Sequence, residues 1–202
     1  MATTGARVAH ASDNTADAPD PSASASPTGE NTPSRWMTRL QIGIRWMLPS
    51  DERALLAQDG YDFSSTYALT GDFAWYVTPV LGAGAWVDHS IRKSTPQFGG
   101  PTLTQSFYAG GVEAPLRLTR SRACELLLIP KLGYGWSFLD FGGDDHPLHA
   151  IGYGGDVSVL FPRAHISLTA SWLNGPTGRP TGAGRDYNFG GIAVLLGGMI
   201  DG

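Results

Sequence analysis

The stretch WMTRLQIGIRWML, residues Trp36 to Leu48, decides how the rest of the sequence is interpreted. Its even positions are mostly apolar and include Trp36 and Trp46 near the two ends. Its odd positions include Arg39 and Arg45, together with methionine, glutamine and glycine. Because successive side chains of a β-strand point to opposite faces, this stretch predicts a strand with one apolar and one polar face.

The separation of the two tryptophans indicates what the apolar face contacts. Trp36 and Trp46 lie ten positions apart in the chain. At about 3.3 Å per residue and a tilt near 40°, this separation corresponds to roughly 25 Å of height, close to the apolar band of a transmembrane β-barrel. The stretch therefore predicts a strand with lipid on one side and a polar lumen on the other.

Composition excludes several classes of protein. The 202 residues suffice for one domain and a tail. The net charge of −4 does not suggest nucleic-acid binding, which would require a stripe of basic residues. The sequence contains no run of 18 or more apolar residues, so no transmembrane helix is predicted. The single Cys124 excludes an internal disulfide and a multi-cysteine metal site, and we interpret it as a buried thiol. We expect no cofactor, no metal and no nucleic-acid partner.

The N-terminal segment, residues 1–34, differs from the rest in composition. It is rich in Ala, Ser, Thr, Asp and Pro, so it cannot bury enough apolar surface to offset its ordering entropy and is predicted to be disordered. Residues 35–202 form the predicted barrel domain. Val8 to Ser12 has the small-x-small form of a signal-peptidase site without the apolar segment that should precede it. One hypothesis places that segment upstream of Met1, and the alternative is chance.

Seven further stretches are predicted strands; six alternate in the same way, and the last is less clear in phase because of the pairs Gly190-Gly191 and Gly197-Gly198. The seven are residues 66–77, 80–90, 103–118, 125–138, 149–161, 164–173 and 187–200. Their connections alternate between tight turns and longer loops at 49–65, 91–102, 140–148 and 174–186, of which the first contains a possible two-turn helix, Asp51 to Gln58. Transmembrane barrels place short turns at one end and longer loops at the other. The sequence predicts an all-β, eight-stranded antiparallel up-and-down transmembrane β-barrel with both chain ends on the short-turn side.

Aromatic side chains gather near the strand ends in this arrangement. The expected belt near the long loops contains Trp46, Tyr67, Tyr108, Trp136, Tyr153 and Trp172, and the belt near the short turns contains Trp36, Trp75 and Phe161. Tyrosine and tryptophan favour the headgroup level because one end of the ring is apolar and the other forms hydrogen bonds. Ordinary core aromatics would scatter along the strands instead.

Charged residues on the polar faces balance each other. The predicted inward set is Arg39, Arg45, Arg117 and Lys131 with Asp72, Asp88, Glu113 and Asp156. An eight-stranded barrel has room only for its own side chains, and buried charges are costly unless they are paired. We therefore expect an ion-pair network centred on Glu113, Arg117, Lys131 and Asp156. Inward glycines would make room for Tyr76 and Trp86, which predicts a filled barrel that conducts ions poorly.

In strand pattern, loop alternation and belts, residues 35 to about 200 resemble the small eight-stranded outer-membrane barrels of the OmpA/OmpX type. The resemblance implies a location in the bacterial outer membrane among its lipids, periplasmic termini, and a porin-like fold with a structural or surface-interaction role through the long loops. Many members end on an aromatic residue, whereas this chain ends Met199-Ile200-Asp201-Gly202. Pro115 and Pro130 also fall inside expected strands, where we predict a bulge or early fraying of the ladder.

Two alternatives stay open from the sequence alone. His165-Ile166-Ser167, expected to face inward at both ends, resembles the His-x-Ser pair of the outer-membrane lipid A deacylases of the PagL type. The loop that follows offers only Asp186 to orient the histidine. The second alternative is a soluble ligand-binding barrel of the lipocalin or avidin kind, which would place Leu40 and Ile42 inside and Arg39 outside.

Overall fold

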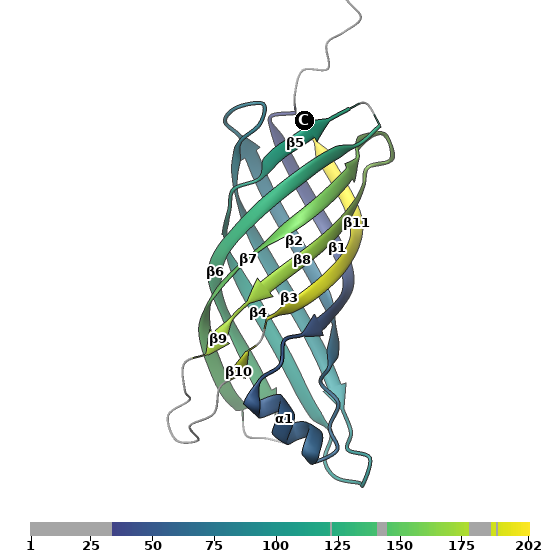
Figure 1. The fold of residues 1–202 in the computed structure, drawn as a ribbon, viewed down its shortest axis with the longest axis vertical. Coiled ribbons are helices and arrows are strands. Elements are labelled where there is room, and N and C mark those ends of the chain that lie inside the picture. Colours follow the sequence, from purple (N-terminus) through teal and green to yellow (C-terminus); the bar gives the residue numbers. More distant parts are fainter. Residues whose placement is uncertain (1–33, 122, 141–144, 178–186, 189) are drawn as a thin grey trace, which may run out of the picture. The chain divides into compact units, whose positions relative to one another are not determined.

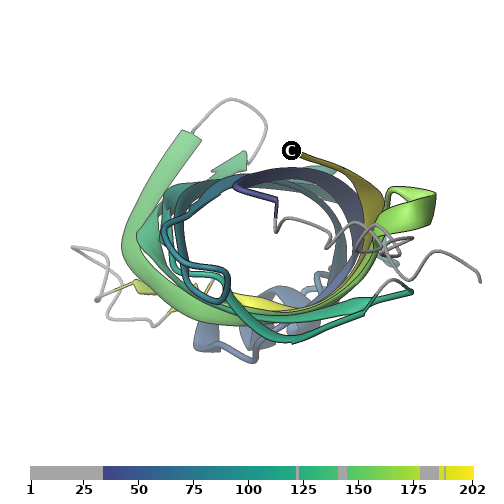
Figure 2. The same ribbon diagram turned by 90° about the horizontal axis from the view of Figure 1, so that it is seen from above.

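The computed structural model describes residues 34–121, 123–140, 145–177, 187–188 and 190–202. In this part of the chain, antiparallel strands form a closed barrel (Figures 1 and 2). Apart from Ser34, the predicted disordered tail lies outside the described residues, as does the signal-peptidase-like segment Val8 to Ser12. The division into tail and barrel at residues 34 and 35 stays a prediction.

The barrel wall consists of consecutive antiparallel neighbours. Its strands are β1 (Trp36–Met47), β2 (Ser65–Tyr76), β3 (Gly82–Ser94), β4 (Leu103–Glu113), β5 (Leu116–Arg120), β6 (Glu125–Asp140), β7 (Asp145–Phe161), β8 (Ile166–Asn174) and β11 (Gly191–Asp201). The first and last strands pair from Met37 opposite Asp201 to Met47 opposite Gly191. Both β4 and β5 pair with β6, so together they occupy one strand position of the wall. The predicted eight-stranded antiparallel barrel is confirmed.

The interruption between β4 and β5 corrects the single strand expected at 103–118. Ala114 and Pro115 separate the two pieces, because proline has no N–H to donate to a ladder. The Pro115 carbonyl instead accepts a hydrogen bond from the Gly82 N–H at 2.9 Å. The register against β6 is the same on both sides of this interruption and shifts between Arg117 and Thr119. The irregularity predicted here is present in β4–β5, while Pro130 stays inside β6.

The hairpins on the long-loop side are longer than predicted. β3 continues to Ser94 rather than ending at residue 90, and β7 begins at Asp145 rather than at residue 149. Hydrogen-bonded pairing continues there past the point where side-chain alternation is clear, since a ladder needs only backbone groups. The connections expected at 91–102 and 140–148 are therefore shorter, and residues 141–144 of the second lie outside the described part.

The other two connections on this side contain secondary structure. The predicted helix is present as α1 (Asp51–Gln58), capped by the Ser50 side chain. Short strands β9 (Pro176–Thr177) and β10 (Tyr187–Asn188) pair with each other, so the last wall strand begins at Gly191 rather than at residue 187. Residues 178–186 lie outside the described part. No helix among the described residues is long and apolar enough to cross a membrane.

The short turns and the two ends of the barrel chain lie together at the opposite end (Figure 1). The Gly202 carbonyl accepts a hydrogen bond from the Arg35 N–H at 2.6 Å. The turn after β7 is a 3-10 helix, η1 (Pro162–Ala164), followed by His165. Cys124, predicted to be buried, is only partly buried in the turn before β6.

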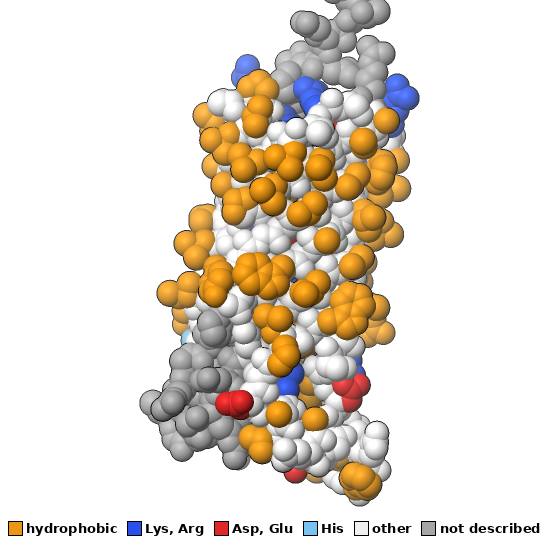
Figure 3. Space-filling model, viewed as in Figure 1, with side chains coloured by type: hydrophobic (Ala, Val, Ile, Leu, Met, Phe, Trp, Pro, Cys, Tyr) orange, Lys and Arg blue, Asp and Glu red, His pale blue; other side chains and the backbone are white. Residues whose placement is uncertain are grey.

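The strands place apolar side chains outside and polar ones inside. On β1, Leu40 and Ile42 are 64% and 62% exposed, whereas Arg39 and Gln41 are 2% and 1% exposed. Figure 3 shows hydrophobic side chains over the visible wall, with charged groups gathered toward its ends. Inside, the small Gly133 leaves space for a ring, because a Cβ there would lie 2.8 Å from Trp86. Tyr76 and Trp86 are both buried, as expected for inward rings.

Candidate functional site

The direction of the side chains excludes the soluble-carrier alternative. A lipocalin-like barrel requires Leu40, Ile42, Leu128 and Leu168 to converge on a dry centre, but all four are exposed on the wall. Arg39 would have to be in water and is instead buried. An exposed apolar band of this extent is unfavourable in water and suits contact with acyl chains. The fold and its surface define a transmembrane β-barrel.

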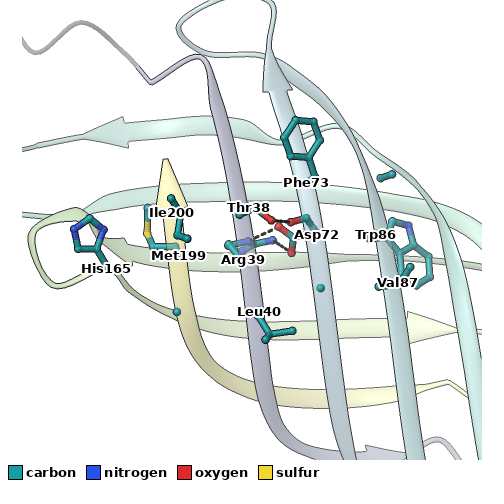
Figure 4. Close-up of a pocket in the computed structure, with 13 residues that line it drawn as sticks. Thr38, Arg39, Leu40, Asp72, Phe73, Trp86, Val87, His165, Met199 and Ile200 are labelled. Atoms are coloured by element: carbon teal, nitrogen blue, oxygen red, sulfur yellow. Dashed lines mark hydrogen bonds and ion pairs between the residues drawn. The ribbon is translucent and has the colours of Figure 1, made fainter. Parts of the chain in front are cut away.

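Five charged side chains from five strands form the lumen network: Arg39, Asp72, Glu113, Lys131 and Asp156. The Arg39 guanidinium contacts Asp72 through two nitrogens, with Nη2 to Oδ2 at 2.8 Å and Nε to Oδ1 at 2.9 Å (Figure 4). Lys131 Nζ lies 2.6 Å from Asp156 and 3.9 Å from Glu113. The bidentate pair is the strong geometry for arginine and carboxylate, so it orders the middle of the lumen.

Neutral polar side chains extend this network across the lumen. Arg39 Nη1 donates to Ser158 Oγ at 2.8 Å, and Ser158 Oγ lies 2.7 Å from Thr169 Oγ1. Gln41 Nε2 donates to Thr169 Oγ1 at 2.7 Å and to Ser167 Oγ at 2.9 Å. Strands far apart in the chain are therefore connected through side chains as well as through the ladder.

The other predicted lumen charges form separate pairs. Arg45 and Asp88 lie 2.5 Å apart nearer the long loops. Arg117 was expected beside Glu113, but its Nε lies 3.3 Å from Glu125, and its guanidinium stacks 3.6 Å from the Tyr76 ring centroid. Glu125 was not predicted as an inward charge from the sequence. Alternation could have identified it, because Glu125 is an even number of residues from the inward Lys131 on β6. Arg117 keeps the register of Glu113 against β6 but lies four residues further toward the short turns, which places it away from the network.

The predicted belt residues lie on the outer wall. Tyr67, Trp46 and Trp75 are among the exposed large side chains, as are Tyr108, Trp136, Tyr153, Phe161 and Trp172, while Trp36 is partly buried. Trp36 pairs in register with Trp75 next to the short turns. Near the long loops, Tyr108 stacks on Trp136 at 5.9 Å, and Tyr153 meets Trp172 edge to face at 5.9 Å.

The histidine and serine expected to form a catalytic pair point to opposite sides of the wall. Ser167 is fully buried in the lumen, whereas His165 is exposed and lines a groove on the outside. The inward prediction for His165 was wrong because η1 ends with His165 in the left-handed conformation, at φ 53°, which removes it from the alternation of β8. Asp186 lies outside the described residues. The geometry therefore does not support a deacylase-like pair.

No metal centre is formed by the residues described here. Within the described ranges, no group of three or more His, Cys, Asp and Glu side chains could hold an ion. His89 instead places its Nδ1 3.1 Å from the Phe107 carbonyl, and His149 stacks on Tyr134 with a centroid separation of 5.9 Å.

On the long-loop side, residues 48–64 and 95–102 form the loop platform. Leu56 and Phe63 pack with the buried Leu103, and Tyr61 Oη donates to the Pro101 carbonyl at 2.9 Å. Arg53 at the helix donates to the Asn188 carbonyl. At the tip, Phe98 is 88% exposed. Ordered contacts thus present one large apolar side chain outward beyond the barrel wall.

An ion pair connects the loop platform to β3. Arg92 Nη2 lies 2.7 Å from Asp62 Oδ2, and the Asp62 N–H donates to Ser94 Oγ at 2.8 Å. Hydrogen bonds from the side chain and backbone of Ser64, together with the nearby Arg92, hold the pKa of the Asp62 carboxyl below its usual value. This interaction is therefore present when the carboxylate is ionised.

Acid is expected to loosen this connection. The pKa of Asp62 is depressed in the folded state, so its contribution is complete above the unfolded pKa of about 3.9 and is lost as pH falls through the lower folded value. Asp62→Asn should speed amide hydrogen exchange at residues 60–64 at pH 7, after correction for the intrinsic rate. Exposed Asp59 provides the control variant Asp59→Asn. Equal exchange in the two variants at pH 7 would contradict the assignment.

Comparison with known proteins supports the class of fold. The barrel is similar to the solved structure of Ail, the attachment invasion locus protein of Yersinia pestis, with a TM-score of 0.51 and 12% identity over 81% of this chain and 98% of that one. It is also similar to Neisserial surface protein A, with a TM-score of 0.51 and 14% identity over 81% and 94% of the two chains. No protein-family model and no curated protein matches the sequence. The chain has the fold of the small eight-stranded outer-membrane barrels, as the resemblance predicted.

Proposed function

We propose that this protein is an integral protein of the bacterial outer membrane that presents its long loops to partners at the cell surface. The observation that carries the proposal is the inverted distribution of side chains, with Leu40 and Ile42 exposed on the wall and Arg39 buried. Lipid is the solvent that makes this distribution favourable. The aromatic side chains near both strand ends would then lie at the two headgroup levels.

The proposed orientation places the short turns and termini in the periplasm and the loop platform outside the cell. Outer-membrane barrels carry their longer loops on the extracellular side. In this chain the ordered helix α1 and the exposed Phe98 both lie on that side. The two similar structures are named for attachment, invasion and the cell surface, which agrees with a surface role.

The lumen is proposed to serve as a structural core rather than as a pore or an active site. Apart from Arg117, which contacts Glu125, the charges predicted to lie inside are paired with each other, and Ser167 accepts a hydrogen bond from Gln41 instead of contacting His165. Apolar side chains, including Met37, Leu127 and Met199, fill the lumen next to the short turns. We propose no enzymatic activity, because among the described residues His165 and Ser167 lie on opposite sides of the wall and do not form a base–nucleophile pair.

Cysteine labelling on intact cells tests membrane location and orientation together. In a Cys124→Ser background, Phe98→Cys is expected to react with a membrane-impermeant maleimide on whole cells. Arg163→Cys, exposed at the short-turn end, should react only after the outer membrane is permeabilised. The reverse pattern would contradict the orientation. Recovery of the protein in the aqueous fraction, without detergent, would contradict the membrane location.

A further inference from the structure

A groove of about 760 Å³ runs along the outside of the barrel over β11, β1, β2 and β3 (Figure 4). Its floor contains the small outward residues Gly71, Ala85 and Gly198. A Cβ on Gly198 would have no heavy atom closer than 3.9 Å, so the floor is open there. Larger apolar side chains form the walls, namely Leu40, Phe73, Val87 and Ile200. This shape suits one flexible hydrocarbon chain.

His165 lies at one side of this outer groove, beside Met199 and Ile200 (Figure 4). Among the described residues it is the one non-glycine residue with a positive φ, at 53°, a conformation that side chains with a Cβ rarely adopt. Its carbonyl accepts a hydrogen bond from the Met199 N–H at 2.9 Å, which holds the turn against β11. The strained turn thus keeps an exposed imidazole beside an apolar groove.

The short-turn end of the barrel is basic. The exposed arginines there are Arg35, Arg120 and Arg163, of which Arg120 contacts the buried Glu125 at 3.1 Å. Asp201 is the one acidic side chain described at this end that is not buried, and Ser34 Oγ donates to it at 2.6 Å. Arg163 lies two residues before His165, in the same turn. The charges at this end of the barrel, where His165 lies, therefore favour an anion.

We propose that the outer groove and His165 bind an anionic glycerophospholipid from the leaflet at the short-turn end. One acyl chain runs across the strands between two rows of side chains, with Leu40 and Val87 on one side and Phe73 and Ile200 on the other. The phosphate is bound by the His165 imidazole. An imidazole donates a hydrogen bond to phosphate oxygen in either protonation state, and arginine adds a charge-assisted one. The inference rests on the proposed membrane location, since only a bilayer supplies this ligand to the wall.

Lipid selectivity in vesicles tests the site. The complete barrel is reconstituted in phosphatidylcholine vesicles that contain a trace of spin-labelled phosphatidylglycerol or phosphatidylcholine, and the motionally restricted fraction is measured. His165→Ala is expected to lower the selectivity for phosphatidylglycerol about fivefold, as for the loss of one hydrogen bond. Gly198→Leu, which fills the floor, should release the restricted lipid. His149→Ala, which removes an exposed histidine elsewhere on β7, should change neither value.

A second variant separates binding from stability. His165→Gly relieves the positive φ, so it should raise the urea midpoint of unfolding while it lowers phosphatidylglycerol selectivity as much as His165→Ala does. A histidine with only a structural role would leave the selectivity unchanged. Unchanged selectivity in both His165 variants, or an equal loss in His149→Ala, would overturn the site. Protease protection on the same vesicles reports insertion, so failure to insert would contradict the proposed function instead.

Discussion

Ile42→Arg is expected to lower the free energy of unfolding in phospholipid vesicles by about 2–4 kcal/mol, the cost of a cationic side chain near the bilayer midplane. Ile42 lies on β1 between Trp36 and Trp46, and its ladder neighbours Leu69 and Leu196 are also exposed on the wall. The guanidinium would therefore have apolar neighbours on both adjacent strands. Urea unfolding followed by tryptophan fluorescence measures the change.

The same substitution near the rim provides the control. Val77 follows β2, is 73% exposed, and belongs to the short turn in which its N–H donates to the Leu81 carbonyl at 3.0 Å. Val77→Arg should cost about 0–1 kcal/mol because the interface tolerates the charge. In a barrel surrounded by water, both substitutions would be nearly neutral. An Ile42→Arg cost no larger than that of Val77→Arg would contradict the membrane-facing assignment of this wall.

Alternation made most of the barrel predictable from the sequence. A strand has a period of two, so Arg39 inside and Leu40 outside follow from parity once one face is assigned. The same alternation, applied to each strand separately, places Glu113, Lys131 and Asp156 in one lumen, although they come from three different strands. Which carboxylate contacts which cation depends on how far neighbouring strands are shifted along each other, and alternation within a strand does not predict this shift. The Arg39–Asp72 pair therefore became visible only in the structure.

The errors occurred where the backbone departs from a regular strand. Pro162 begins a 3-10 turn rather than a two-residue turn, and the extra residues move His165 from the lumen to the outer wall. Arg117 is a different kind of error: it keeps the register of Glu113 against β6, but it lies four residues nearer the short turns, where it contacts Glu125. Strand ends such as Ser94 were misplaced because hairpin ladders continue without an alternating pattern. The outer groove depends on four strands that are adjacent in space, which no local pattern reveals.

Arg39→Met is expected to lower the free energy of unfolding by about 3–5 kcal/mol, as for the loss of one partner from a buried ion pair. Arg39 is 2% exposed, and its removal leaves Asp72 without the bidentate contact and Ser158 without its donor. Three carboxylates of the lumen network would then share Lys131 alone. Arg163→Met, at an exposed arginine, should change stability by less than about 0.5 kcal/mol.

The double variant Arg39→Met/Asp72→Leu distinguishes a broken pair from a cavity. Replacing both partners with apolar side chains removes the uncompensated charge, so most of the loss caused by Arg39→Met should be recovered. Lys131 keeps its 2.6 Å contact with Asp156, so the rest of the lumen network persists. A double variant as unstable as Arg39→Met would show that packing, rather than charge pairing, makes Arg39 important. Because an inward arginine is tolerated only when it is paired, the recovery measures how far this lumen depends on electrostatic pairing.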